Sequence, residues 1–469
     1  MASRAANQPR TIGELRAAGH ARETVKQEMR RNLLARLRTG KPVFPGIVGY
    51  EKTVVPLIAN AIISGHDVIL LGERGQAKSR LMRSMVDLLD AEVPAIAGCE
   101  INDHPYTPIC RRCRDLVAAR GEEVEIAWLA GERRYGEKLA TPDTSIADLI
   151  GEVDPIKVAE GRYLADELTI HFGLVPRTNR GVFGINELPD LAERIQVGLL
   201  NIMEEKDVQI RGYRVRLQLD IFMIASANPE DYTSRGRIIT PLKDRFGSQV
   251  RTHYPIQASE EIEIMEAERV PQPADVEVVV PGFMREIVAE ITHLARRSPH
   301  ISQSSGVSVR MSIGNYENLI SNAVRRAVRL SEEVAVPRVS DLSFLVASTA
   351  GRVEIEAIDE GREEQVLGRI QRSAVSSVFG RHLSPGQFEG LVERFEEGAV
   401  VEVGEAMPAA GYARALEGLE SELTAALRRL EVRDRPEVRA SVIEFLLEGL
   451  HLGKKINKDE MEGRSLYRR

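Results

Sequence analysis

A short apolar run, Asp67–Leu71, leads directly into the glycine-rich segment Gly72–Ser79, and a helical pattern follows over Arg80–Asp90. A strand, a glycine loop and a helix in this order cradle a phosphate group, because the glycines let backbone N–H groups curl around an anion. The start of the helix adds the positive end of its dipole. The pattern therefore predicts an α/β core and a phosphate site made of Gly72, Glu73, Arg74, Gly75, Gln76, Ala77, Lys78 and Ser79.

Individual side chains of this segment have predicted contacts of their own. Lys78 can reach the terminal phosphates as a point charge, and the hydroxyl of Ser79 can ligate Mg²⁺. Ala77 stands where the general pattern has a glycine. The lysine, the hydroxyl and the flanking elements are nevertheless all in register, which favours a phosphate site over a glycine turn that binds nothing.

The rest of the chain predicts an α/β core followed by helices. Short apolar runs alternate with helical stretches up to about residue 257, as in a parallel sheet that is buried on both faces. The predicted strands are Asp67–Leu71, Glu125–Leu129, Gly181–Ile185 and Asp220–Ala225. The predicted helices outside the core are residues 11–40, Ser259–Val270, Phe283–Ser298, Gly314–Leu330, Ser340–Ile358 and Gly411–Leu430. We predict an N-terminal helical arm over 1–41, a nucleotide-binding core over 42–257, a helical lid over 258–360 and a helical C-terminal extension over 361–469.

Composition narrows the range of partners. The chain of 469 residues has a net charge of −7, which argues against a general nucleic-acid binder because such proteins need a basic surface for phosphates. No apolar run approaches the ~20 residues of a membrane span, and the basic N-terminal segment lacks the apolar region of a signal peptide. Three cysteines, an odd number, fit a reducing compartment. We therefore expect a cytoplasmic protein with no membrane span.

Polar residues follow two of the other predicted strands. The strand Gly181–Ile185 leads into Asn186 and Glu187, at the place where P-loop ATPases carry an acidic pair. The first acid of such a pair helps to hold Mg²⁺ and the second polarises the attacking water. Glu187 is therefore the candidate general base, whereas Asn186 is an amide that brings no charge to the metal. Asn228, which follows Asp220–Ala225, can hydrogen-bond the water or the γ-phosphate.

Taken in order along the chain, these segments resemble the AAA+ ATPases, and within them the MoxR-like proteins and the ATPase (I) subunit of magnesium chelatase. The resemblance covers about residues 44–350. A loop of the form G-x-A-K-[ST] is familiar in MoxR-like proteins, so Ala77 supports this branch. The segments that carry the resemblance are Phe44–Glu51, Gly72–Ser79, Asn186–Glu187, Ser226–Pro229 and Pro241–Phe246, followed by the helical lid.

The resemblance implies roles for further residues. Val48 is expected to contact the nucleotide, and Asn228 takes the place of the sensor-1 residue. Arg310, at the start of a predicted lid helix, resembles the sensor-2 arginine. Arg245 resembles the arginine finger that stabilises charge at the neighbouring subunit's ATP, with Arg237 as the competing candidate. The implied catalytic set is Glu187, Asn228, Arg245 and Arg310, with Ser79 and Asn186 at the Mg²⁺.

Two segments resemble hairpins that line the ring pore in this branch. Residues 205–219 are basic and alternating, with a turn near Gly212, and resemble the hairpin before sensor 1. Residues 148–177 resemble the insertion in helix 2. The motif Gly-Ala-Phe-Thr-Gly-Ala of the related transcription activators is absent from this sequence, which argues against that function.

All three cysteines fall within residues 99–113. Cys110 and Cys113 have the spacing of a structural zinc site, and Cys99 with His104 could complete a tetrahedron. A proline-rich loop with little core of its own would gain order from a metal. The alternative is a set of unliganded thiols in a loop, and an iron–sulfur cluster is less favoured with three thiolates.

The resemblance implies ATP and Mg²⁺ as ligands and a ring, commonly a hexamer, because an arginine from the next subunit completes each site. Hydrolysis would move the lid and the hairpins and thereby act on a partner. The main reading is a magnesium chelatase-like ATPase subunit. A MoxR-like chaperone is the alternative, and Asn186 also leaves open an ATP-dependent scaffold with little hydrolysis. A von Willebrand A-type partner is expected for both the chelatase-like subunit and the MoxR-like chaperone. A tetrapyrrole-loaded partner is expected for the chelatase-like subunit only.

Overall fold

The structure is a computed structural model that forms two compact units, Met1–His253 and Tyr254–Arg469. In the part of the chain that the structure describes, no helix combines the length and the apolar character needed to cross a membrane. The described residues are 8–154, 156, 159, 167–204, 207–210, 213–228, 237–271, 275–302, 306–355, 362–415, 420–461 and 463–469.

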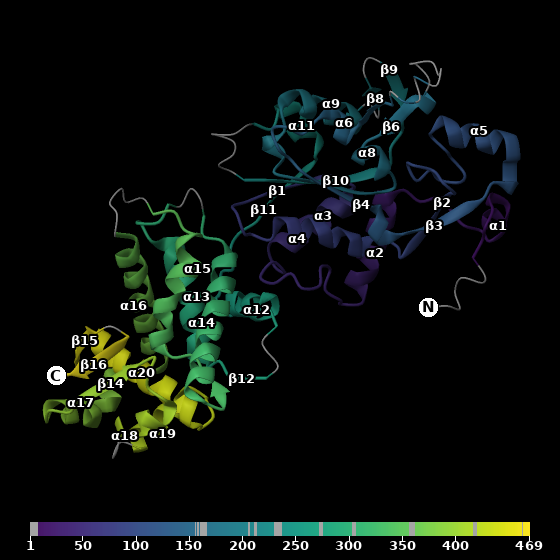
Figure 1. Cartoon of the computed structure of the whole chain (residues 1–469). Coiled ribbons are helices and arrows are strands. Elements are labelled where there is room, and N and C mark those ends of the chain that lie inside the picture. Colours follow the sequence, from purple (N-terminus) through teal and green to yellow (C-terminus); the bar gives the residue numbers. More distant parts are fainter. Residues whose placement is uncertain are drawn as a thin grey trace. The chain divides into compact units, whose positions relative to one another are not determined.

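A parallel sheet forms the centre of the first unit (Figure 1). Among the described residues its strand order is β11-β1-β10-β7-β4, and every neighbouring pair is parallel. Side chains of β1 alternate between two cores: Ile69 belongs to one, Val68 and Leu70 to the other. The predicted α/β class is thus confirmed, with both faces of the sheet buried. The strands are β1 (Val68–Leu71), β4 (Tyr135–Leu139), β7 (Gly181–Asn186), β10 (Ile221–Ala227) and β11 (Ser248–Arg251).

Three of the predicted strands are confirmed as β1, β7 and β10, but the fourth has a different place. The run Glu125–Leu129 corresponds to β3 (Ile126–Ala130), which pairs antiparallel with β2 (Glu92–Ile96) outside the main sheet. The sheet instead uses β4 and β11, which have the sequences YGEKL and SQVR. These two strands lie at the edges of the sheet, where one side of the strand is open and polar side chains are tolerated.

The prediction of one continuous N-terminal helix over residues 11–40 is wrong. It is divided into α1 (Ile12–Ala17) and α2 (Val25–Arg38). The break occurs because Gly19 has φ +71, which ends α1, and Thr24 starts a new helix with a capping box to Gln27. The predicted cap at Thr11 is confirmed, since its side chain accepts the N–H of Glu14 at 3.2 Å.

The remaining elements of the first unit flank the sheet or extend from it. Helices α3 and α4 contribute buried apolar residues to the core on one face, and α8, α9 and α11 to the core on the other face. The helices are α3 (Val54–Ser64), α4 (Lys78–Ser84), α5 (Arg111–Arg120), α6 (Ile146–Leu149), α8 (Leu174–Arg177), α9 (Glu193–Glu204) and α11 (Thr240–Arg245). Two hairpins also belong here, β5 (Gly151–Val153) with β6 (Ile170–Phe172) and β8 (Asp207–Ile210) with β9 (Tyr213–Arg216). Short 3-10 turns cover Met85–Leu88, Gly121–Glu123, Gly131–Arg134, Glu167–Thr169 and Leu188–Asp190.

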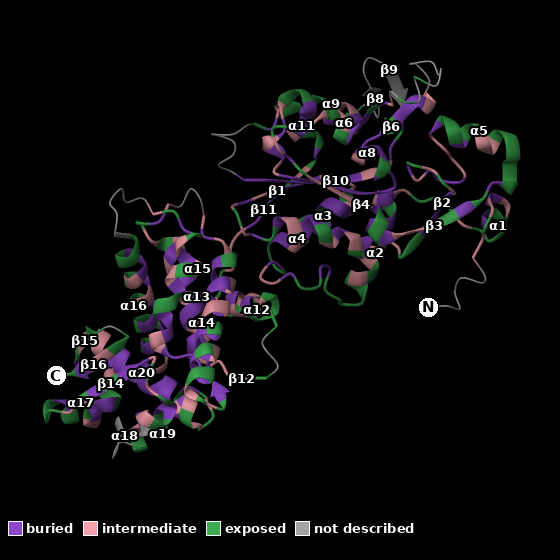
Figure 2. Cartoon of the chain, in the orientation of Figure 1, coloured by how far each residue is buried: buried purple, intermediate pink, exposed green. Residues whose placement is uncertain are grey.

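The second unit is mainly helical and has one large apolar core that extends from Met265 to Tyr467. Buried residues gather on α13, α14 and α20, as Figure 2 shows. The segments predicted as lid and C-terminal extension therefore share this core. The helices are α12 (Ala258–Glu268), α13 (Gly282–Arg297), α14 (Val309–Leu330), α15 (Val346–Ala350), α16 (Arg362–His382), α17 (Glu389–Glu396), α18 (Ala409–Ala415), α19 (Glu420–Arg429) and α20 (Pro436–Leu452). Two 3-10 helices, Val339–Leu345 and Pro385–Phe388, precede α15 and α17.

Strands also occur in the second unit, although the sequence predicts helices there. The strands β14 (Val401–Gly404), β16 (Arg464–Arg468) and β15 (Asn457–Met461) form a small antiparallel sheet. The sequences of β15 and β16 are charged and lack an apolar alternation, and β14 alternates only over Val401, Glu402 and Val403, which is too short for periodicity to reveal it. A parallel pair, β12 (Glu277–Val278) with β13 (Val334–Ala335), lies elsewhere in the unit. The predicted helix Gly411–Leu430 corresponds to parts of α18 and α19, with residues 416–419 outside the described part of the chain.

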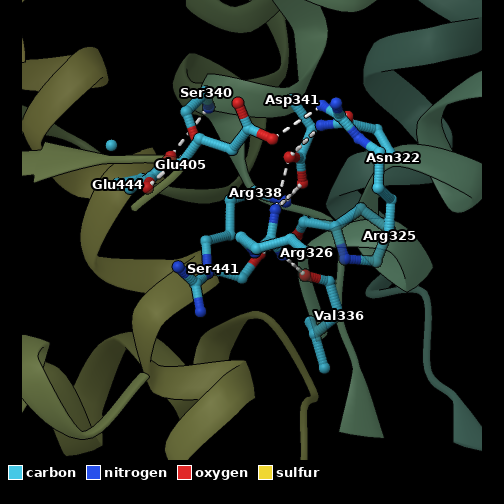
Figure 3. A network of polar contacts seen from close by, with 12 residues as sticks. Asn322, Arg325, Arg326, Val336, Arg338, Ser340, Asp341, Glu405, Ser441 and Glu444 are labelled. Carbon is cyan, nitrogen blue, oxygen red and sulfur yellow. Dashed lines mark hydrogen bonds and ion pairs between the residues drawn. The ribbon is translucent and has the colours of Figure 1, made fainter. Parts of the chain in front are cut away.

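A buried polar network joins α14 to the segment that follows it (Figure 3). The carboxylate of Asp341 accepts hydrogen bonds from Arg326, from Asn322 Nδ2 at 2.6 Å and from the N–H of Arg338 at 2.7 Å. The guanidinium of Arg326 is 0% exposed and Asp341 is 1% exposed, so this ion pair is removed from water. Next along the chain, Ser340 donates its N–H to Glu444 of α20 at 2.7 Å.

Candidate nucleotide-binding site

The parallel sheet brings the predicted nucleotide residues together at one edge. Strand β10 lies between β1 and β7 and is parallel to both, so the carboxyl ends of these three strands are neighbours. Gly72 follows β1, Asn186 ends β7, and Asn228 follows β10. Ligand sites of open α/β sheets form at this edge. The fold thus places side by side three segments that are far apart in the sequence.

The glycine-rich loop has the backbone geometry that its sequence predicts. A β-carbon at Gly72 would lie 1.9 Å from Thr252 Oγ1 and 2.2 Å from Gln76 Oε1, so no larger residue fits there. Gly75 has φ +74, and Ala77 has φ 53 and ψ 17, the left-handed conformation that glycine favours. Ala77 therefore keeps the glycine-type backbone of the general pattern, at a cost of ~1–2 kcal/mol.

Contacts from the flanking segments hold the loop in place. Gln76 Oε1 accepts the N–H of Glu73 at 3.1 Å and the hydroxyl of Thr252, after β11, at 2.7 Å. The hydroxyl of Tyr50 lies 2.8 Å from the carbonyl oxygen of Gln76. Burial raises the pKa of Tyr50, so its hydroxyl stays protonated. Val48 is half-buried two residues before Tyr50, and its predicted contact with the nucleotide stays a prediction.

Lys78 lies inside the loop. Its Nζ donates to the carbonyl oxygens of Gly72 and of Glu73, the latter at 2.8 Å, and to Asn228 Oδ1 at 2.6 Å. The residue is 6% exposed, so the ammonium is fixed by these acceptors. The structure therefore brings together the lysine that is predicted to bind phosphate and the asparagine that is predicted to sense it.

The predicted metal residues meet through one chain of hydrogen bonds. Ser79 Oγ lies 3.0 Å from Asn186 Oδ1, and Asn186 Nδ2 donates to Glu137 Oε1 at 2.6 Å. Asn186 Oδ1 also accepts the hydroxyl of Ser226 at 3.0 Å. Glu137 belongs to the edge strand β4, next to β7. A carboxylate thus stands directly beside the amide that replaces the usual acid.

Sequence reasoning missed Glu137. Its strand is polar and lacks the apolar run that marks the other strands, and only the pairing of β4 with β7 places it at the site. Two further groups contact it: Arg83 Nε donates to Oε2 at 2.8 Å, and the Tyr135 hydroxyl lies 3.1 Å from the same oxygen. Burial, together with the negative charge of Glu137, raises the pKa of Tyr135, which stays a neutral donor.

Glu187 stands at a sharp turn directly after the buried strand β7. Its backbone has φ 57 and ψ 49, a left-handed conformation that is uncommon for a residue other than glycine. Its N–H donates to Ser226 Oγ at 3.0 Å, which ties the turn to β10. Strained backbone of this kind clusters at functional sites, and here it directs the chain away from the sheet at the candidate base.

The candidate arginines are all on the surface. Arg245 ends α11 and pairs with Glu204 of α9, and this hydrogen bond raises the pKa of its guanidinium. Arg237 is also exposed, and its carbonyl oxygen accepts Gln196 Nε2 at 2.9 Å. Both residues are exposed, and the arginine-finger role stays a prediction for each. Arg310 is exposed in the first turn of α14 in the second unit, and its predicted sensor role stays a prediction.

Both predicted pore hairpins contain antiparallel strands. Residues 205–219 hold β8 and β9, and the predicted turn near Gly212 lies outside the described residues. Residues 148–177 hold β5 and β6, with residues 155, 157–158 and 160–166 outside the described part of the chain.

The three cysteines lie close together, and Asp103, not the predicted His104, is the fourth residue of the group. The sulfur atoms of Cys99, Cys110 and Cys113 and a carboxylate oxygen of Asp103 all lie within 4.8 Å of one another. His104 is not part of this group. Its Nδ1 lies 3.0 Å from the N–H of Tyr106, which it accepts as a hydrogen bond.

The chain resembles subunits of magnesium chelatase in sequence. The magnesium-chelatase subunit ChlI of Nostoc sp. is 25% identical over 355 residues, which cover 70% of this chain and 89% of that protein. The ChlI of Nephroselmis olivacea is 23% identical over 357 residues, which cover 70% of this chain and 95% of that protein. A ChlI homolog of Methanocaldococcus jannaschii is 30% identical over 213 residues, 44% of this chain and 53% of that protein. No family model matches the sequence.

Solved structures align with this chain only with low TM-scores. NtrX from Brucella abortus aligns with a TM-score of 0.39 and 15% identity, over 74% of this chain and 67% of that chain. A structure of the complex between the BchI and BchD subunits of magnesium chelatase aligns with a TM-score of 0.34 and 19% identity, over 70% of this chain and 100% of that chain.

The similarity to magnesium chelatase subunits and the geometry of the glycine-rich loop point in the same direction. The relatives that match over most of their own length are named as the ChlI subunit of magnesium chelatase. The glycine loop, its buried lysine and the polar ends of β7 and β10 have the arrangement that an ATP site requires. The chain thus has the loop and strand arrangement of an ATP-binding AAA+ protein and is similar in sequence to the ChlI subunits of magnesium chelatase.

Proposed function

We propose that this protein hydrolyses ATP and uses the reaction to remodel a partner protein or complex. The observation that carries the proposal is the convergence of Lys78, Ser79, Asn186 and Asn228 at one edge of the sheet, with Glu187 directly after β7. In the reaction, water attacks the γ-phosphorus, the bond from phosphorus to the bridging oxygen breaks, and Glu187 accepts the proton of the water. The products are ADP and phosphate.

The residues present suit Mg²⁺. Ser79, Asn186 and Glu137 offer a hydroxyl, an amide and a carboxylate oxygen, and oxygen ligands are those that Mg²⁺ prefers. When bound, Mg²⁺ neutralises charge that develops on the β- and γ-phosphates. We propose that Glu137 supplies the negative charge that Asn186 lacks, either directly or through a water ligand. This supports hydrolysis over a scaffold that binds ATP without turnover.

The assembly and its partner are also proposals. Arg237 and Arg245 are exposed, as an arginine that completes the next subunit's site must be. We therefore propose a ring, with six subunits as the first expectation, in which the hairpin β8–β9 faces the pore. The relatives are named as subunits of magnesium chelatase, which supports a multi-subunit assembly. We propose a von Willebrand A-type protein as the partner. A MoxR-like chaperone activity remains the second reading, and a cytoplasmic location is part of both proposals.

Replacing Glu137 with glutamine tests the proposed Mg²⁺ site. We expect wild-type protein to hydrolyse ATP only when Mg²⁺ is present. Glu137→Gln should lower kcat or the apparent Mg²⁺ affinity by roughly 10–100-fold, because changes around a metal ligand typically have effects of this size. Adding Asn186→Asp to this variant should restore much of the loss, since it returns a carboxylate to the site. The measurement is the ATP hydrolysis rate over a Mg²⁺ titration.

Glu122→Gln is the matched control, because Glu122 is exposed and pairs with Arg16 at the surface. It should behave as wild type. The proposal about Glu137 would be wrong if Glu137→Gln kept wild-type Mg²⁺ dependence, or if Asn186→Asp rescued nothing. A wild-type protein that binds ATP with Mg²⁺ and never hydrolyses it, alone or with added partner, would contradict the proposed function itself.

A further inference from the structure

A cluster of sulfur and oxygen atoms lies in the first unit, in a segment that the proposed ATP reaction does not use. Cys99 follows β2, Asp103 and Cys110 lie in the loop after it, and Cys113 is in the first turn of α5. The three sulfur atoms and one carboxylate oxygen lie within 4.8 Å of one another. Ligand atoms around a tetrahedral zinc ion are ~3.5–3.8 Å apart, given its bond lengths of about 2.0–2.3 Å. The spacing of the four side chains therefore needs little adjustment to bind a metal.

Asp103 provides a second and independent sign of a ligand. The residue is 0% exposed, and its Oδ2 accepts the N–H groups of Ile109 at 3.2 Å and of Cys110 at 3.0 Å. Its Oδ1 is buried and has no hydrogen-bond partner among the described residues. A buried carboxylate oxygen without a partner is costly, because it has lost water and gained nothing. A cation held among the neighbouring sulfur atoms would satisfy it.

The surrounding backbone is arranged as it is around thiolate ligands. The N–H of Asp103 donates to Cys99 Sγ at 3.3 Å, and the N–H of Cys113 donates to Cys110 Sγ at 3.4 Å. Cys110 is the N-cap of α5, so its sulfur lies at the positive end of that helix dipole. Such outer contacts orient metal ligands and stabilise their negative charge.

The loop that carries the cluster is fixed to the rest of the unit on both sides. The N–H of Ile96 donates to the carbonyl of Asp103 at 3.0 Å, and Arg112 Nη1 donates to the carbonyl of Gly98 at 2.8 Å. Asn179 Nδ2, just before β7, donates to the carbonyl of Ile101 at 2.9 Å. Cys99 is only half-buried, which leaves a path for an ion to enter.

We infer that Cys99, Asp103, Cys110 and Cys113 form a closed, structural Zn²⁺ site. Three thiolates and one carboxylate make a four-coordinate set with no open position for substrate, which is the pattern of a structural site and not of a catalytic one. The ion would link β2, the loop 97–110 and α5. Asp103 takes the fourth position that the sequence pattern assigns to His104.

The test is the metal content of the full-length protein, purified in a reducing buffer after expression with added zinc. We expect about one zinc ion per chain in the wild type. Cys113→Ser and Asp103→Asn should lose zinc or bind it at least ~10-fold more weakly. His104→Ala is the matched control, since His104 is a buried neighbour that is not in the cluster, and it should keep its zinc. ATP binding by each variant shows that the fold is intact.

Other outcomes would overturn the inference. Wild-type protein without zinc, both as purified and after titration with Zn²⁺ alone, contradicts the site. Loss of zinc in His104→Ala with retention in Asp103→Asn contradicts the ligand set, and bound iron contradicts the choice of metal. If a variant does not fold, a Co²⁺ titration of metal-free wild type tests whether the cysteines bind a metal. Thiolate-to-cobalt absorption appears only when the cysteines bind the ion together, and its absence would contradict the site.

Discussion

Glu187→Gln is expected to lower the rate of ATP hydrolysis by ~10²–10⁴-fold, because general-base catalysis contributes a factor of this size. Glutamine keeps the shape of the side chain and its ability to hydrogen-bond, but it cannot accept the proton of the attacking water. ATP binding should remain, since the substitution leaves unchanged the loop and Lys78, which we propose as the phosphate ligands. The measurement is single-turnover hydrolysis together with the dissociation constant of ATP.

Glu193→Gln is the control for this variant. Glu193 is exposed in the first turn of α9, so the substitution removes the same charge close to Glu187 in sequence. We expect it to hydrolyse ATP at the wild-type rate. A Glu187→Gln protein whose turnover stays within about twofold of wild type would show that another group activates the water.

Asp341→Asn is expected to destabilise the second unit by ~3–5 kcal/mol, because removing one partner of a buried ion pair leaves a charge uncompensated. The neutral amide would leave the guanidinium of Arg326, which is 0% exposed, without its counter-ion. The same carboxylate also binds Asn322 and the N–H of Arg338, so one substitution weakens several contacts in the network of Figure 3. Amide hydrogen exchange of peptides from α14 reports the loss.

The matched control is Asp459→Asn in the same unit. Asp459 pairs with Arg468 across the β15–β16 hairpin, but the two side chains are 41% and 56% exposed, and exposed pairs contribute ~0–1 kcal/mol. Exchange protection in α14 should therefore be unchanged in the control. If α14 is equally protected from hydrogen exchange in Asp341→Asn and Asp459→Asn, the buried ion pair does not stabilise the second unit as we expect.

The sequence predicts the phosphate loop and the strands that lead into Asn186 and Asn228 because these patterns are local. A glycine-rich turn between a strand and a helix has few alternative structures, and Ala77 keeps the left-handed backbone that the pattern requires. Buried strands are recognised by their apolar runs. The sequence is less informative for the edge strand β4 and for β15 and β16, whose side chains are mostly polar, and for β14, which is only four residues long. Their pairing depends on neighbours distant in the chain.

The same limit explains which site residues were missed. Glu137 reaches Asn186 only because β4 pairs with β7, and no motif around it indicates that contact. Asp103 and His104 are adjacent in the sequence, and spacing alone favours the residue type that more often binds zinc. The loop backbone decides between them, since Asn102 has φ 55 and Asp103 then enters the cluster.

The central claim is that the protein is an ATPase whose site is completed by a second subunit. The most direct measurement is the hydrolysis rate per chain as a function of protein concentration. An arginine supplied by the next subunit predicts a rate per chain that rises with concentration and levels off once the ring has formed. A rate per chain that is constant down to concentrations where the protein is monomeric by light scattering would contradict it.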